Sequence, residues 1–168
     1  MKEIVYNYDH LKDEDINRIV KRAKIVIENS KGELLMGCND DNCHLLGGHV
    51  DEGENDNETL IRELKEEAGI DFNPHVDKPF VSIVYYNKNY PQEGINSKTI
   101  ANYYYIKADL ELHLDDLHLT KDEKKHHFKV LVVLKKDILN VLNEYLEKSV
   151  RKNVVKDTIL VMKEYLKI

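Results

Sequence analysis

The sequence of 168 residues predicts an α/β fold in which a mixed sheet carries helices on both faces. Three observations support this prediction. Runs rich in β-branched and aromatic residues, which are typical of strands, occupy much of the chain. Helical patterns with one apolar side precede, interrupt and follow those runs. The length suits one domain that buries roughly 70% of its unfolded surface, so we expect a single domain over residues 1–168.

The N-terminal region predicts a helix followed by a β-hairpin. A short helix is expected at Leu11–Val20, where Asp13 is a plausible cap and the isoleucines lie on one side. A strand follows at Ala23–Asn29 and ends at the turn-like segment NSKG. The next apolar run, ELLMGC, is expected to pair with it across this turn.

The rest of the chain predicts one helix, three strands and two closing helices. A glycine-bearing loop, HLLGGHVDEGEND, leads into a helix expected at Asn57–Ala68, and Gly69 stands where helices usually end. Three further strands are predicted, at Phe80–Tyr86, Thr99–Leu110 and His127–Leu134. Two amphipathic helices over about 137–167 are expected to cover the sheet within one chain.

Composition limits the possible partners. The net charge of −6 disfavours nonspecific binding to nucleic acid or to an anionic membrane. No stretch approaches the ~20 apolar residues that a membrane span needs, and the apolar run in MKEIVYNYDH is too short for a signal peptide. We therefore expect a cytoplasmic protein. Cys38 and Cys43 make no disulfide framework, so both are expected to be reduced and structural.

The predicted helix carries an acidic stripe that needs an explanation. At 100° per residue, its apolar side chains form one stripe, made of Leu60, Ile61, Leu64 and Ala68. Glu63, Glu66 and Glu67 form a separate stripe, although like charges at this spacing repel one another. A solvated acidic face is the common reason for such a pattern. A site for a hard cation such as Mg²⁺ is the alternative, because Mg²⁺ prefers oxygen ligands.

The loop before the helix favours the cation site. Gly48, five residues, Glu54, seven residues and then the segment from Arg62 to Ile70 fill every specified position of the Nudix box, GX5EX7REUXEEXGU, where U is aliphatic. If each of its seven fixed letters occurs about one time in fifteen, a chance match is well below about one in a million. The chain therefore resembles the Nudix hydrolases, with the box at residues 48–70. Leu46 replaces a frequent proline, but that position lies outside the signature.

The resemblance implies a fold, a reaction and a set of site residues. It implies an α/β/α sandwich that cleaves the pyrophosphate bond of a nucleoside diphosphate linked to another moiety, with Mg²⁺ or Mn²⁺. The implied metal ligands are Glu63, Glu66, Glu67 and the carbonyl of Gly47. Arg62 resembles the family arginine that holds the glutamates in place, and Glu54 resembles the loop glutamate that stabilises the loop. A bound metal ion offsets the acidic pocket and lowers the pKa of a bound water.

Several roles stay open at the level of sequence. Glu123 is the candidate that accepts the proton of the attacking water, and an exposed loop charge is the alternative. His126 and His127 suggest proton transfer, because histidine as a residue type titrates near neutrality, but surface or packing roles are the favoured interpretation. His49 lies within the box loop, where its side-chain position is variable. Tyr86 lies near the position of a tyrosine often found in dinucleoside-polyphosphate hydrolases, although tyrosine is also a good strand former.

We expect a nucleotide-derived small molecule as the partner, and a monomer or homodimer. The alternative function is a Nudix-fold sensor that binds a nucleotide without cutting it. Such proteins commonly lose a box glutamate or the arginine, and this sequence keeps them all. Isopentenyl diphosphate isomerase, a relative with a different reaction, is a remoter alternative, because no obvious context for a catalytic cysteine is present.

Overall fold

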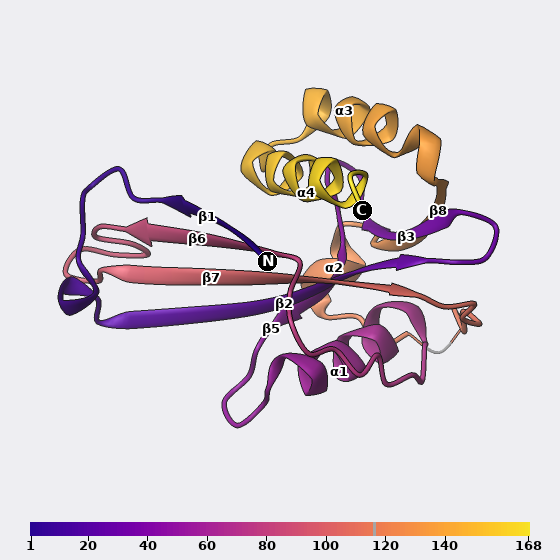
Figure 1. The fold of residues 1–168 in the computed structure, drawn as a ribbon, viewed down its shortest axis with the longest axis horizontal. Coiled ribbons are helices and arrows are strands. Elements are labelled where there is room, and N and C mark those ends of the chain that lie inside the picture. Colours follow the sequence, from indigo (N-terminus) through magenta and orange to yellow (C-terminus); the bar gives the residue numbers. More distant parts are fainter. Residues whose placement is uncertain (116) are drawn as a thin grey trace.

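The computed structural model describes residues 1–115 and 117–168, which form an eight-stranded mixed sheet with helices on both sides (Figure 1). The strand order is β1-β6-β7-β2-β3-β4, with β5 also paired to β2 and β8 to β3. The strands are β1 Lys2–Tyr6, β2 Arg18–Glu28, β3 Glu33–Cys38, β4 Cys43–His44, β5 Leu46–His49, β6 Val81–Asn87, β7 Ser97–Lys107 and β8 Lys129–Leu134.

The helices lie in two layers. They are α1 Asp56–Ala68, α2 Lys121–Lys125, α3 Ile138–Lys148 and α4 Lys152–Tyr165. Figure 1 shows α3 and α4 side by side over one face of the sheet, with α1 on the opposite side. This arrangement confirms the predicted α/β/α sandwich and the two C-terminal helices. None of the helices in the described part of the chain is long and apolar enough to cross a bilayer.

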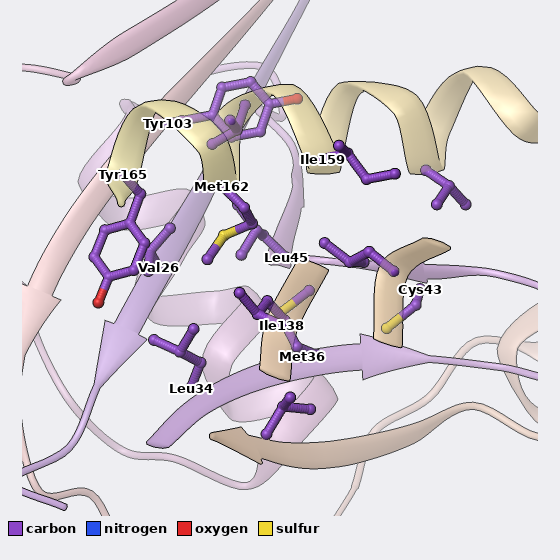
Figure 2. Close-up of a cluster of buried hydrophobic side chains, with 14 of the residues drawn as sticks. Val26, Leu34, Met36, Cys43, Leu45, Tyr103, Ile138, Ile159, Met162 and Tyr165 are labelled. Carbon is purple, nitrogen blue, oxygen red and sulfur yellow. The ribbon is translucent and has the colours of Figure 1, made fainter. Parts of the chain in front are cut away.

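The alternation of side chains along β2 builds two cores. Ala23, Ile25 and Ile27 point to one face, where they pack with Leu60 and Leu64 of α1. The opposite face of the sheet packs against α3 and α4. The core between them includes Val26, Tyr103, Ile138, Met162 and Tyr165 (Figure 2). The sheet is therefore a central layer whose two faces are buried by different helices.

The sheet divides beside β2. Along Arg22–Ile25 this strand pairs with β5, but at Glu28 it pairs with β3 instead. β3 then continues with β8 along its whole length. Glu123 of α2 lies close enough to this division for its charge to act on Lys24 of β2 and Glu67 of α1, so residues far apart in the sequence come together here.

The predicted helix Asn57–Ala68 is confirmed, as is its expected end at Gly69, and the structure also shows the residue that caps its beginning. Asn55 caps the N-terminus, because its side chain accepts hydrogen bonds from the backbone N–H groups of Asn57 and Glu58. Gly69 ends the helix with φ of 64°, a left-handed conformation that glycine adopts without strain.

The helix predicted at Leu11–Val20 is wrong. Asp13–Asp15 forms only one 3₁₀ turn, and Arg18 already begins β2. Along its whole length β2 pairs in parallel with β7. The backbone N–H and C=O groups from Arg18 onward are therefore hydrogen-bonded in a sheet and not in a helix. The strand β1, which the sequence analysis did not anticipate, pairs in parallel with β6 at the edge of the sheet.

The expectation of two reduced cysteines is also wrong. Cys38 and Cys43 are joined by a disulfide. They are paired residues of the hairpin formed by β3 and β4, which brings their Cα atoms to 4.0 Å. Both are fully buried and belong to the core under α3 and α4, so their expected structural role fits their position.

Candidate active site

Arg62 connects the acidic residues of α1 to the preceding loop. Its Nε and Nη2 donate to the two carboxylate oxygens of Glu54 at 2.8 and 3.0 Å. Its Nη1 donates to Glu63 at 2.8 Å and to Glu66 at 3.4 Å. Its Nη2 also donates to the backbone carbonyl of His49 at 2.9 Å. One planar guanidinium thus fixes the loop and orients two carboxylates, a geometry that suits arginine and not lysine.

Glu54 is an anchor of the loop. Besides Arg62, its carboxylate accepts hydrogen bonds from the hydroxyl of Thr59 at 2.8 Å and from the backbone N–H of Asp51 at 3.2 Å. The hydrogen bonds from Arg62, above all, lower the pKa of Glu54 to about 2. Glu54 is therefore ionised at neutral pH and engaged in holding structure.

The three box glutamates differ in their surroundings. The side chain of Glu66 is 38% exposed and that of Glu63 is 13% exposed. Glu67 is 3% exposed, and its Oε2 accepts the backbone N–H of Gly47 at 2.9 Å. Burial raises the pKa of Glu67 to about 8, although the nearby charge of Lys24 and the Gly47 N–H oppose this shift. A cation placed beside Glu67 would stabilise its charged form.

Lys24 supplies one positive charge at this position. Its Nζ donates to the carbonyl oxygens of Gly47 at 2.8 Å and Leu45 at 3.0 Å. Burial lowers the pKa of Lys24, and the charge of Glu67 acts against this effect. The carbonyl of Gly47, which the resemblance implies as a metal ligand, thus holds an ammonium group here. Carbonyl oxygens and carboxylates around this point favour a cation.

Two glycines allow the loop to approach the helix and the sheet. Gly47 has φ of 113°, and a Cβ on it would fall onto the backbone carbonyl of Ala23. A Cβ on Gly48 would fall onto the carboxylate of Glu63. Gly47 is therefore required by its conformation and by space, whereas a side chain at position 48 would displace the carboxylate of Glu63.

The donor set fits a hard divalent cation. Within residues 1–115 and 117–168, no group of three or more histidine, cysteine or acidic side chains is already arranged around one metal position. The chemistry of the donors nevertheless agrees with Mg²⁺ or Mn²⁺, because carboxylates and a carbonyl oxygen converge next to a bound ammonium group. Glu63, Glu66, Glu67 and the carbonyl of Gly47 are the groups that would hold it.

The other predicted residues lie at different distances from this centre. The charge of Glu123 contributes to the raised pKa of Glu67, so α2 brings it close to the site. One of its carboxylate oxygens accepts the backbone N–H of Thr120 at 2.7 Å as part of a helix cap. His126 and His127 bind Asp122 and Asp40 near the end of α2 and do not begin a strand, because β8 starts only at Lys129.

Tyr86 does not face the box loop. Its hydroxyl donates to Asp13 at 2.7 Å, and the ammonium of Lys98 lies over its ring at 4.9 Å from the centroid. In the antiparallel pair of β6 and β7, Tyr86 is opposite Lys98. The tyrosine that suggested a dinucleoside polyphosphate is thus engaged with the N-terminal turn.

Three cationic residues of β2 escaped the sequence analysis. Lys24 interrupts the apolar run AKIVIEN, and this interruption was the available signal. Arg18 and Arg22 lie on the same face as Lys24 at alternate positions of the strand. The incorrect helix at Leu11–Val20 hid this alternation, because it placed Arg18 in a different type of element from Lys24.

The comparison with families of known proteins agrees with this fold and site. A model of the NUDIX domain matches residues 19–143, which is most of the chain. The protein belongs to the Nudix family. A search of curated proteins finds no match.

Solved structures with a similar fold include proteins of low sequence identity. The solution structure of the E. coli ORF135 protein is 14% identical in sequence and has a TM-score of 0.54. The match covers 94% of this chain and 94% of that one. A MutT protein from Methanosarcina mazei is 20% identical with a TM-score of 0.49, and the match covers 90% of this chain and 97% of that one. The first of these likenesses supports the fold.

Proposed function

We propose that this protein is a pyrophosphohydrolase that cleaves the pyrophosphate bond of a nucleoside diphosphate linked to another moiety, with Mg²⁺ or Mn²⁺. One observation carries the proposal. The buried carboxylate of Glu67 accepts a hydrogen bond from the backbone N–H of Gly47, and the carbonyl of Gly47 accepts one from the Nζ of Lys24. Arg62 orients Glu63 and Glu66 beside this point. An acidic pocket alone would repel a pyrophosphate, so this arrangement is useful for hydrolysis only when a divalent cation offsets its charge.

The residues of the chain divide the work as follows. Glu63, Glu66, Glu67 and the carbonyl of Gly47 hold the ion. When bound, the ion supplies positive charge to the phosphate oxygens and lowers the pKa of a coordinated water. Arg62 keeps Glu63 and Glu66 oriented, and Glu54 holds Arg62 and the loop in place through its hydrogen bonds. The preorganised groups thus stabilise charge that develops during phosphoryl transfer without a large rearrangement.

Glu123 is proposed to accept the proton of the attacking water. Its charge acts on both Glu67 and Lys24, which supports a position at the same centre. The carboxylate oxygen that is not engaged with Thr120 is available for this task.

The experiment is a hydrolysis assay over a panel of nucleoside triphosphates, dinucleoside polyphosphates, nucleotide sugars and ADP-ribose, with Mg²⁺, Mn²⁺ or a chelator. We expect metal-dependent turnover of at least one member and a loss of about a thousandfold or more in Glu67→Gln. Glu52→Gln is the matched control, because Glu52 is an exposed carboxylate of the same loop. Full activity of Glu67→Gln would exclude this metal site. An inert wild-type protein whose melting temperature rises with one nucleotide would indicate a sensor.

A further inference from the structure

A small basic pocket lies beside the box loop on the face of the sheet that carries Lys24. It has a volume of about 170 Å³. Its lining residues come from β2, the end of β5, the loop between β6 and β7, and the start of β7: Arg18, Arg22, His49, Tyr90, Ser97 and Thr99. Ligand pockets for whole drug-sized molecules measure roughly 300–1,000 Å³, so this pocket suits one group of a larger ligand.

The register of the strands fixes the distance from this pocket to the candidate metal site. Arg22 pairs with His49, and two residues further along the same strands Lys24 pairs with Gly47. Two residues of a strand span about 7 Å. Arg18 lies another four residues away, about 13 Å beyond Arg22. The pocket is thus adjacent to the metal site, but a group bound between the two arginines lies outside it.

The charges of the pocket are uncompensated. In the part of the chain that the structure describes, neither Arg18 nor Arg22 makes an ion pair or a side-chain hydrogen bond, and no carboxylate lines the pocket. This is unusual in a protein with a net charge of −6. An anion is the ligand that such a pocket attracts.

An unsatisfied hydroxyl gives a second and independent indication. Ser97 is only 2% exposed, and its Oγ has no hydrogen-bond partner among the described residues. Ser97 pairs with Arg18 across β7 and β2 and lines the same pocket. Leaving a buried hydroxyl unpaired is costly, so a ligand that accepts its hydrogen bond would recover that cost.

We propose that this pocket binds a second phosphate of the substrate, one that is not part of the pyrophosphate bond being cut. Arg18 and Arg22 donate to its oxygens in the forked geometry that suits phosphate, and Ser97 donates its hydroxyl. The proposal rests on the proposed function, because it takes the box as the place of cleavage. The second phosphate comes either from a longer phosphate chain or from a phosphate on the sugar of the nucleotide.

The test is a measurement of binding by calorimetry in a chelator, so that metal and turnover do not contribute. One arm compares adenosine 5′-tetraphosphate with ADP, which tests a longer chain. The other compares ADP-ribose 2′-phosphate with ADP-ribose, which tests a phosphate on the sugar. We expect a preference of about tenfold or more for the extra phosphate in one arm, as charged hydrogen bonds of this kind provide.

The variants identify the residues responsible. Arg18→Gln and Arg22→Gln should each reduce the preference about tenfold, while Lys21→Gln should retain it, because Lys21 lies on the same strand with its side chain on the opposite face. Ser97→Ala should weaken binding without lowering the melting temperature of the free protein. A purely structural serine would do the reverse.

The outcomes separate this inference from the proposed function. No preference in either arm, or a preference that survives in both arginine variants, overturns the inference. If the wild-type protein hydrolyses members of the substrate panel in that case, the proposed function still stands. If it shows the preference in binding and hydrolyses nothing, the pocket is supported and the proposed function fails.

Discussion

Glu67 and Lys24 bind the two backbone groups of the same residue, Gly47. Glu67 accepts the N–H of Gly47 at 2.9 Å, and the carbonyl of Gly47 accepts the ammonium of Lys24 at 2.8 Å. A carboxyl group and an amino group are therefore held at the same glycine, where burial raises the pKa of Glu67 and lowers that of Lys24.

Lys24→Met should increase the affinity for Mn²⁺. The ammonium occupies the carbonyl that we assign to the metal ion, so its removal takes away both a competitor and a like charge. A charge a few ångströms away is worth roughly 4 kcal/mol at most under partly screened conditions, and a gain of about tenfold is a conservative expectation. Calorimetric titration with Mn²⁺ measures it. Lys21→Met, on the other face of β2, is the control, and weaker binding in Lys24→Met would contradict the competition.

Gly48→Ala should impair turnover through Glu63. A methyl group at this position would meet the carboxylate of Glu63, so either that side chain or the loop must shift. We expect a loss of about a hundredfold in kcat/KM, because a displacement of about 1 Å is enough for such an effect. The partner variant Glu63→Ala removes the clash. Melting temperatures of Gly48→Ala, Glu63→Ala and the double variant should therefore be non-additive, and strictly additive values would show that the two residues do not meet.

Arg62→Lys should reduce both stability and activity, although the positive charge is kept. Lysine cannot reproduce the two parallel hydrogen bonds to Glu54 while also reaching Glu63. We expect a loss of about 1–3 kcal/mol in the free energy of unfolding, measured with denaturant, and a loss of turnover at saturating metal. Retained stability with lost turnover would mean that Arg62 acts mainly on the substrate.

Glu28 should make the stability of the protein depend on pH in the acid range. This carboxylate is 6% exposed and accepts the hydroxyls of Tyr165 at 2.6 Å and Tyr105 at 2.8 Å. The hydrogen bond from Tyr165, first, lowers the pKa of Glu28 below its ordinary value of 4.5, against the effect of burial. Its contribution is thus fully present above pH 4.5 and is lost as the pH falls through the lower pKa of the folded state.

The comparison of Tyr165→Phe with the wild-type protein tests this contribution. We expect a loss of about 1–3 kcal/mol at pH 7, as for a hydrogen bond to a charged group, and a smaller difference below pH 4. Thermal or denaturant unfolding from pH 3 to 7 gives both values. A difference that does not change with pH would mean that Tyr165 stabilises the fold by packing alone.

The sequence predicted best those elements whose signals are local. The helix from Asp56 to Ala68 has a cap, an apolar stripe and a terminal glycine, and the box pattern places its acidic residues without any tertiary information. The pairing of β2 with β7 is not local, since it joins Arg18 to Ser97 across about half of the chain. Residues 18–20 therefore form a strand despite the helical pattern at Leu11–Val20, because they pair with β7, a partner that the sequence alone does not reveal.

The candidate site was predicted as far as its motif extends. Arg62 and the box glutamates follow a fixed spacing, and the structure brings them together with Gly47. Lys24 and Ser97 follow no motif. Their importance depends on the register of β2 with its neighbours, because that register decides which face each side chain takes. The disulfide between Cys38 and Cys43 likewise depends on a hairpin whose register sequence spacing does not fix.

The hydrogen bond between Glu28 and Tyr165 ties the last helix to the sheet. The family match ends at residue 143, which invites trimming of the chain to the matched segment. Such a shortened protein would lose α4 and with it the core residues Val155 and Met162, and it would leave the carboxylate of Glu28 without the hydroxyl of Tyr165. The last helix is therefore part of the folded unit, although the family match ends before it.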